Sequence, residues 1–209
     1  MATLPRAAYI PFDTDMGLDP AVELAAGFLK RVGADEAAIV ILPEKRVLGV
    51  SGPLQRFSRN RTVLTPRNAN QSALAYGHPA LVCAPGLKEL ELARRYTRDN
   101  PVVVVEDPSF SCGFWADEIG ALNLVERRIH MTTRPERHRK ILEGIDYAGT
   151  NGWGDAPGKR DLHRYLAELA EIDALDKNEI LAHQLVHGRH GHYGSLTCLG
   201  REIDRARHG

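Results

Sequence analysis

Residues 9–20, YIPFDTDMGLDP, decide the fold, because they carry the chain from a strand into a helix. The apolar run at 8–12 is typical of a short buried strand. Asp19 and Pro20 then predict a helix start, with an acceptor side chain at the N-cap and a proline at the first helical position, where its missing N–H costs nothing. One apolar face follows, formed by Val22, Ala25, Ala26 and Leu29. A strand that leads into an amphipathic helix is the repeating unit of an α/β fold.

The same alternation continues to about residue 125. Apolar runs predict strands at 37–42, 61–64, 80–84, 102–105 and 122–125. Helical periodicity lies between them, at 87–97 and more briefly at 116–120. Strands that alternate with helices predict a Rossmann-like, mostly parallel sheet with flanking helices. No GxGxxG sequence follows the first strand, so this is a prediction of layers and not of dinucleotide binding.

The rest of the chain is helical in pattern. Asp161 is a candidate N-cap for one helix, and Asp176 with Glu179 resembles the capping box of the next. Apolar spacing places the three helices at about 161–172, 176–187 and 196–207.

A basic segment separates the two parts. Residues 127–140 hold six Arg or Lys against one Glu. We therefore predict a Rossmann-like α/β domain over residues 1–130 and a small all-helical C-terminal domain or extension over 131–209.

Composition narrows the class of protein. The 209 residues are 43% hydrophobic and 26% charged, with a formal net charge of zero, which is the balance of a globular protein with a core. Three cysteines without CxxC spacing do not form a disulfide framework or a four-cysteine zinc site. No apolar run approaches the roughly 18 residues that span a bilayer. We expect a cytoplasmic protein without a membrane partner, and the composition leaves its oligomeric state open.

Acidic side chains follow two of the predicted strands. Asp13 and Asp15 come after the first strand, and Glu106 and Asp107 come after the run of four valines. In an open α/β sheet, ligands bind at the carboxyl ends of the strands. If these strands are neighbours, the carboxylates converge and favour a hard divalent cation, Mg²⁺ or Ca²⁺. We predict these four residues as metal ligands, with Asp13 and Asp15 also catalytic. The alternative is that these residues only form turns and helix caps.

The residues 13–19, DTDMGLD, together with the preceding strand resemble the DxDxGxDD motif of inosine–uridine-type nucleoside hydrolases. That resemblance implies calcium bound by Asp15 and Asp19, with Asp13 as a hydrogen-bonding neighbour and cleavage of an N-glycosidic bond. Pro20 stands where the second Asp of the final pair is expected.

The same turn resembles the DxD sequence of haloacid-dehalogenase-type phosphatases. This resemblance implies Asp13 as nucleophile, Asp15 as acid/base, Thr65 as the phosphate-binding hydroxyl and the Glu106–Asp107 pair as metal ligands. The strand that ends in Glu106 also resembles a Toprim strand. Partial likeness to three families indicates a shared α/β geometry more than membership in one of them.

Basic residues supply candidate phosphate sites. No Asp or Glu occurs between residues 45 and 87, a stretch that includes Arg67. Lys159 and Arg160 precede a helix, although the GxxxxGK[ST] phosphate loop is absent there. We predict that Thr65, Arg67, Lys159 and Arg160 bind substrate or phosphate groups.

His183 and His187 are spaced i, i+4, so they share one helical face and are a candidate transition-metal pair. Gln184 stands where the HExxH motif has its catalytic Glu. The alternative is a solvated helix end.

Two functions remain open on sequence alone. The first is a divalent-metal-dependent hydrolase that acts on a nucleoside, nucleotide or other phosphate-containing small ligand. The second is a non-catalytic nucleic-acid-binding or protein-interaction module that uses the basic segments and the helical C-terminal region.

Overall fold

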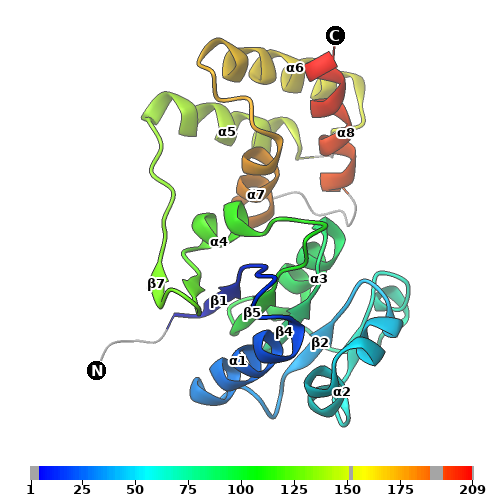
Figure 1. The fold of residues 1–209 in the computed structure, drawn as a ribbon. Coiled ribbons are helices and arrows are strands. Elements are labelled where there is room, and N and C mark those ends of the chain that lie inside the picture. Colours follow the sequence, from blue (N-terminus) through cyan, green and yellow to red (C-terminus); the bar gives the residue numbers. More distant parts are fainter. Residues whose placement is uncertain (1–4, 151–152, 189–194, 209) are drawn as a thin grey trace. The chain divides into compact units, whose positions relative to one another are not determined.

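The computed structural model describes residues 5–150, 153–188 and 195–208 (Figure 1). The chain divides into two compact units, residues 1–131 and residues 132–209, which are described separately below as the α/β unit and the helical unit. None of the described helices is both long enough and apolar enough to cross a membrane.

A seven-stranded sheet forms the centre of the α/β unit (Figure 1). Its strand order is β3-β2-β4-β5-β1-β6-β7, and every neighbouring pair is parallel except β6 and β7. The strands are β1 Ala7–Ile10, β2 Ile39–Ile41, β3 Val63–Leu64, β4 Ala80–Cys83, β5 Val102–Val105, β6 Leu122–Asn123 and β7 Arg128–Ile129. This sheet confirms the predicted α/β fold class, and β1 and β5 are neighbours in it.

Helices cover both faces of the sheet. They are α1 Leu18–Arg31, α2 Gly52–Ser58, α3 Leu87–Thr97 and α4 Gly113–Ile119, with short 3₁₀ turns η1 Lys45–Val50 and η2 Ala69–Gln71. Crossover connections between parallel strands are right-handed. The connections from β1 and β2 run in one direction along the sheet and those from β4 and β5 run in the other, so α1 and α2 pack on one face and α3 and α4 on the opposite face.

Strand register builds the core on the α1 face. Ala8, Val103 and Leu81 lie opposite one another across three neighbouring strands, and Ile10, Val105 and Cys83 do the same two residues later. These side chains pack against the apolar face of α1, which includes the fully buried Val22 and Leu29. Near-continuous apolar strands are what a parallel sheet covered on both faces requires.

The first helix does not begin where the sequence predicts. α1 starts at Leu18, so Asp19 lies inside its first turn and is not the N-cap. Gly17 is the N-cap residue, with φ of 71°, a conformation that glycine adopts without strain. The amide of Gly17 donates to the Asp13 carbonyl at 3.2 Å, and this turn brings the chain into the helix early. Asp19 instead stabilises the positive end of the helix dipole.

The described residues of the helical unit form four helices: α5 Glu136–Ala148, α6 Ala156–Glu171, α7 Lys177–His187 and α8 Ser195–His208. α6 begins five residues before the predicted N-cap Asp161, because Asp155 accepts a hydrogen bond from the Gly158 amide at 2.9 Å. Asp176 does cap α7, as predicted, through the Glu179 amide.

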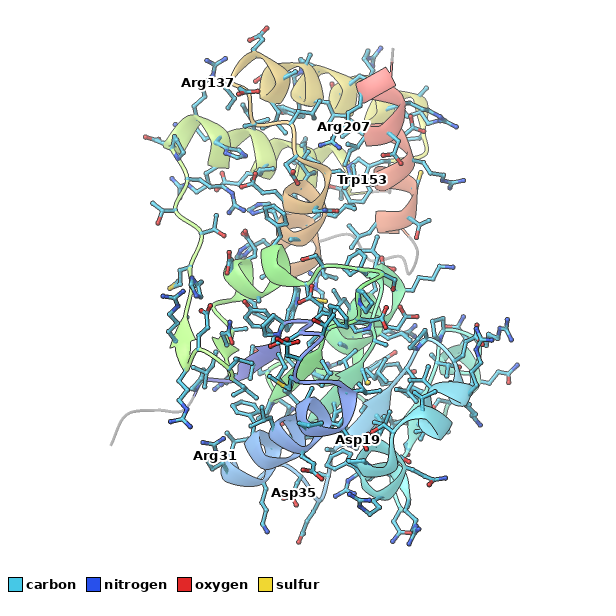
Figure 2. All side chains as sticks on the ribbon, in the orientation of Figure 1. Asp19, Arg31, Asp35, Arg137, Trp153 and Arg207 are labelled. Carbon is cyan, nitrogen blue, oxygen red and sulfur yellow. The ribbon has the colours of Figure 1, made fainter. Side chains whose placement is uncertain are left out.

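Trp153 anchors the connection between α5 and α6 (Figure 2). Its side chain is fully buried, and its indole nitrogen donates to the Ile145 carbonyl at 3.0 Å. The ring lies directly against Gly149, where a Cβ atom would be 2.3 Å from it. The tryptophan therefore belongs to the core and not to an exposed binding loop.

Candidate functional site

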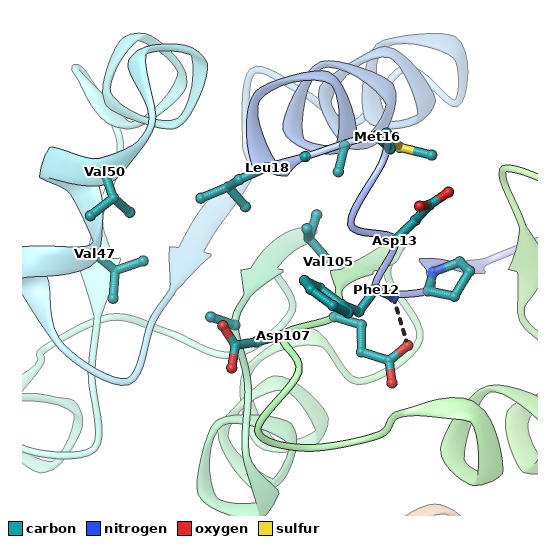
Figure 3. Close-up of a pocket in the computed structure, with 13 residues that line it drawn as sticks. Phe12, Asp13, Met16, Leu18, Val47, Val50, Val105 and Asp107 are labelled. Carbon is teal, nitrogen blue, oxygen red and sulfur yellow. Dashed lines mark hydrogen bonds between the residues drawn. The ribbon is translucent and has the colours of Figure 1, made fainter.

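A pocket of about 190 Å³ lies at the carboxyl edge of the sheet (Figure 3). The connections that leave β1 and β5 run to opposite faces of the sheet, and such a divergence opens a crevice between neighbouring strands. The lining comes from the ends of β1, β4 and β5, from η1 and from the start of α1. It consists of Pro11, Phe12, Asp13, Met16, Gly17, Leu18, Ala21, Val47, Val50, Ala84, Val105, Glu106 and Asp107.

Glu106 ties together the two loops that form the pocket. One carboxylate oxygen accepts from the Phe12 amide at 3.1 Å, across 94 residues of sequence, and the other accepts from the Cys112 amide at 3.0 Å (Figure 3). Hydrogen bonds to an ionised acceptor are about twice as strong as neutral ones. The first role of Glu106 is therefore to hold the loop after β1 against the loop after β5.

Asp13 and Asp107 each form a local turn with one oxygen. Asp13 Oδ1 accepts from the Asp15 amide at 2.8 Å, and Asp107 Oδ1 accepts from the Ser109 amide at 3.0 Å. Among the described residues, none hydrogen-bonds the second oxygen of either carboxylate. Those two oxygens can accept hydrogen bonds from a ligand or hold a hydrated cation.

The structure separates Asp15 from this group. Asp15 is exposed and does not line the pocket. Figure 3 shows the Asp13 and Asp107 side chains pointing in different directions. Among the described residues, which include all four predicted acidic ligands, Asp13, Asp15, Glu106 and Asp107 do not supply three ligand atoms within 4.8 Å of one another. Metal binding by these carboxylates stays a prediction.

The predicted phosphate ligands lie elsewhere. Thr65 is buried at the end of β3, and its amide and hydroxyl both donate to Asn68 Oδ1, so it forms a turn. Arg67 is exposed in that same turn, outside the pocket lining. Lys159 and Arg160 belong to α6 of the helical unit, where the Lys159 ammonium lies 3.5 Å from Glu202.

The charge of the pocket lining is one-sided. Three carboxylates line it, from Asp13, Glu106 and Asp107, and no Lys, Arg or His of the described residues does. The remaining surface is mostly apolar, and Phe12 and Val50 at its rim are 46% and 68% exposed. Such a pocket favours a neutral or cationic ligand with an apolar ring and disfavours a phosphate group unless a cation accompanies it.

The sequence analysis did not predict η1, which forms one wall of the pocket, or the helix α2 that follows it. Val47 and Val50 of η1 line the pocket, but their segment has no helical or strand period. A signal was present directly after Val50, because Ser51 followed by Gly52-Pro53 is a helix start: Ser51 Oγ accepts from the Leu54 amide at 3.2 Å.

Burial favours the neutral thiol form of the two cysteines near the pocket, Cys83 and Cys112. Burial, with a smaller contribution from the Asp107 charge, raises the pKa of Cys83 to about 12. Burial and then the charge of Glu106 also raise the pKa of Cys112. A thiol with so high a pKa supplies almost no thiolate at neutral pH.

The basic segment before and within α5 is largely paired with acids. Arg134 forms the most buried of these pairs, with side-chain exposures of 10% for Arg134 and 16% for Glu179. The other pairs are Arg128–Glu126, Arg137–Glu171, Arg139–Glu143 and Lys140–Glu136. This pairing leaves residues 127–140 with less free positive charge than their composition implies.

The histidine pair lies on α7 as its spacing predicts. The ring centroids of His183 and His187 are 4.8 Å apart, with His183 buried and His187 exposed. Gln184 is fully buried, and its amide nitrogen donates to the Leu142 carbonyl at 2.8 Å, so it joins α7 to α5. Metal binding by the pair stays a prediction.

Comparison with protein-family models, with curated proteins and with solved structures finds no match to this chain. The site therefore has to be interpreted from its own geometry.

Proposed function

We propose that the α/β unit is a hydrolase that binds a nucleoside-like small molecule in the pocket at the carboxyl edge of the sheet. One observation carries this proposal: the pocket combines an apolar surface with three carboxylates, and its lining includes no basic side chain. At about 190 Å³ it is smaller than the roughly 300–1,000 Å³ of pockets for drug-sized ligands, so it encloses the sugar ring and leaves the base at the exposed rim of Phe12 and Val50.

The charge of the lining favours cleavage at a sugar carbon over transfer of a phosphoryl group. Hydrolysis of a glycosidic bond develops positive charge on the sugar ring, which nearby carboxylates stabilise. Phosphoryl transfer develops negative charge on oxygens and needs cationic groups around them. Asp13 and Asp107 supply the first kind of environment.

In this mechanism Asp13 or Asp107 accepts a proton from a water that attacks the sugar carbon. The carbon–nitrogen bond breaks as the carbon–oxygen bond forms, and the base leaves with its bonding electrons and takes up a proton from solvent. The protonated carboxyl then releases its proton to solvent. Phe12 and Val50 contact the apolar base, while the second oxygens of Asp13 and Asp107 accept from sugar hydroxyls. A divalent cation held by these carboxylates would lower the pKa of a bound water.

Calorimetric titration with purine and pyrimidine nucleosides tests binding, with and without Mg²⁺ or Ca²⁺, and chromatography tests release of the free base. We expect the binding that depends on Asp13 to be tighter for a nucleoside than for its monophosphate, and Asp13→Asn to lower the turnover by about 100-fold or more. Asp15→Asn is the matched control, because Asp15 belongs to the same turn but lies outside the lining. Monophosphate binding that depends on Asp13 and is tighter than nucleoside binding, or equal losses of turnover from both variants, would contradict the proposal.

A nucleic-acid-binding or protein-interaction module remains the alternative function. The ion pairs of residues 127–140 argue against that segment as its main contact. Under that alternative, Asp13→Asn leaves every binding property unchanged.

A further inference from the structure

A second candidate site lies at the opposite edge of the same sheet. Tyr76 precedes β4, and Arg95 and Arg98 lie at and just after the end of α3, which leads into β5. Parallel strands all begin at one edge, so these residues lie at the amino edge, away from the pocket. We refer to Tyr76, Arg95 and Arg98, with Tyr96 behind them, as the tyrosine platform.

Two tyrosines give the platform a fixed base. Tyr96 is buried, and its hydroxyl donates to the Ala69 carbonyl at 2.9 Å. The amides of Gly77 and His78 both donate to the Tyr96 carbonyl, at 2.7 and 3.0 Å. The backbone that follows Tyr76 is thus held against α3, while the Tyr76 side chain stays 45% exposed.

Two guanidinium groups surround the exposed ring. Arg95 donates to the Tyr76 hydroxyl from Nε at 3.3 Å and from Nη2 at 3.1 Å. Arg98 Cζ lies 5.1 Å from the Tyr76 ring centroid, within the range of a cation–π contact. Within the described part of the chain, no carboxylate forms an ion pair with Arg98, although the exposed Asp99 follows it in sequence.

Arg98 adopts a backbone conformation that suits glycine. Its φ is 50° and its ψ is −117°, and the Asn100 amide donates to the Thr97 carbonyl at 2.9 Å. These are the angles of the first central residue of a type II′ turn, a position that glycine dominates. An arginine there is strained, and residues held under such strain concentrate at functional sites.

We propose that the tyrosine platform binds a nucleoside phosphate. The base stacks on the Tyr76 ring in place of the Arg98 guanidinium, which moves from the ring to the phosphate, as bases stack on aromatic side chains in single-strand-binding proteins. The phosphate is bound by the guanidinium fork of Arg98, whose planar geometry matches its oxygens, while Arg95 holds the Tyr76 hydroxyl. The tyrosine platform does not depend on the proposed hydrolase activity, because it is a different site. The pocket is lined by carboxylates, and the platform carries guanidinium groups.

The ligand has two sources with the same chemistry: a free nucleotide, and a nucleotide within a single-stranded nucleic acid. Fluorescence anisotropy with a labelled oligothymidylate, and calorimetry with thymidine monophosphate, separate them in the full chain at low salt. Binding of the monophosphate as tightly as the oligonucleotide assigns a free nucleotide. Tight binding of the oligonucleotide that the monophosphate does not displace assigns a single strand. Both results support the proposal.

Three variants test the site itself. Tyr76→Leu and Arg98→Gly should each raise the dissociation constant by about tenfold or more, because each removes a stacking or phosphate contact. Arg98→Gly should also raise the midpoint of thermal unfolding, since glycine relieves the strained turn, so its weaker binding does not come from misfolding. Arg59→Gln is the charge-matched control, an exposed arginine that follows α2, and should leave binding within about twofold.

Three results would overturn the proposal. The first is that wild type binds neither the oligonucleotide nor the monophosphate. The second is that Arg59→Gln weakens binding as much as Arg98→Gly, which means a diffuse charge effect. The third is that inorganic phosphate displaces the ligand as effectively as the monophosphate, which means that the base contributes nothing.

Discussion

Replacing Glu106 with alanine should loosen the wall of the pocket more than any change at its acidic neighbours. The substitution removes the shared acceptor of the Phe12 and Cys112 amides and leaves the loops after β1 and β5 without their connection. Cys112 is fully buried, so water does not readily replace the carboxylate at its amide.

The magnitude follows from these two hydrogen bonds. A hydrogen bond to a charged group contributes about 1.5–3 kcal/mol, and the bond to the exposed Phe12 lies at or below the low end of that range. We therefore expect Glu106→Ala to lower the free energy of unfolding of the α/β unit by about 2–3 kcal/mol. Glu106→Gln should cost about 1–2 kcal/mol, because the amide oxygen still accepts one bond while the amide nitrogen faces the other donor.

Hydrogen exchange measured by mass spectrometry resolves this effect, since peptides from β1 and β5 report on the α/β unit and peptides from α6 report on the helical unit. In Glu106→Ala, the amide protection of the β1 and β5 peptides should fall, and that of the α6 peptides should not. Asp15→Ala is the control, an exposed acidic residue of the same segment. This role of Glu106 is refuted if the protection of β1 and β5 in Glu106→Ala changes by less than about 0.5 kcal/mol, or if Asp15→Ala lowers that protection by as much.

Three further predictions concern single side chains. Gly149→Ala should destabilise the helical unit by about 2–4 kcal/mol, because its Cβ would lie 2.3 Å from the buried Trp153 ring. Gly154→Ala is the control, since no atom lies within 4 Å of its Cβ, and its free energy of unfolding in urea should stay within about 0.5 kcal/mol of wild type. Burial raises the pKa of Glu202, but the hydrogen bond from His163 and the charges of Arg205 and Lys159 outweigh burial and hold the pKa below 4.5. The Glu202 carboxylate therefore stabilises the folded chain above pH 4.5. This stabilisation is lost as the pH falls through the lowered pKa of the folded state. Glu202→Gln should thus lower the free energy of unfolding by about 1–2 kcal/mol at pH 7 and make that free energy depend less on pH below 4.5. An unchanged dependence on pH contradicts this prediction. Cys83, with a pKa of about 12, should resist iodoacetamide at pH 8 in the folded chain and react once urea unfolds it, as mass spectrometry of its peptide will show.

The sequence was sufficient for the layers of the fold because those layers rest on local patterns. The run of four valines and the apolar face of α1 specify a buried strand and an amphipathic helix without reference to distant residues. The position of Asp13 and Glu106 at the carboxyl edge follows from the same patterns, because a parallel sheet gathers all of its strand ends.

The direction of individual side chains depends on distant partners. Both oxygens of Glu106 bind backbone amides, and the Phe12 amide lies 94 residues away in the sequence. The early start of α1 depends on a turn between Asp13 and Gly17 that a capping rule applied to Asp19 does not include. Propensities and caps describe one element at a time, so they place a residue at an edge but do not say what it binds there.

The two outermost strands of the sheet, β3 and β7, are each two residues long. A sheet edge is normally a template on which another molecule can add a strand through its free amides and carbonyls. An edge of two residues offers too few of these groups to order an incoming chain, and β7 carries a charged Arg128 as well. The four buried central strands thus stay out of reach of intermolecular pairing, which protects a sheet of this apolar character from fibrous aggregation at high protein concentration.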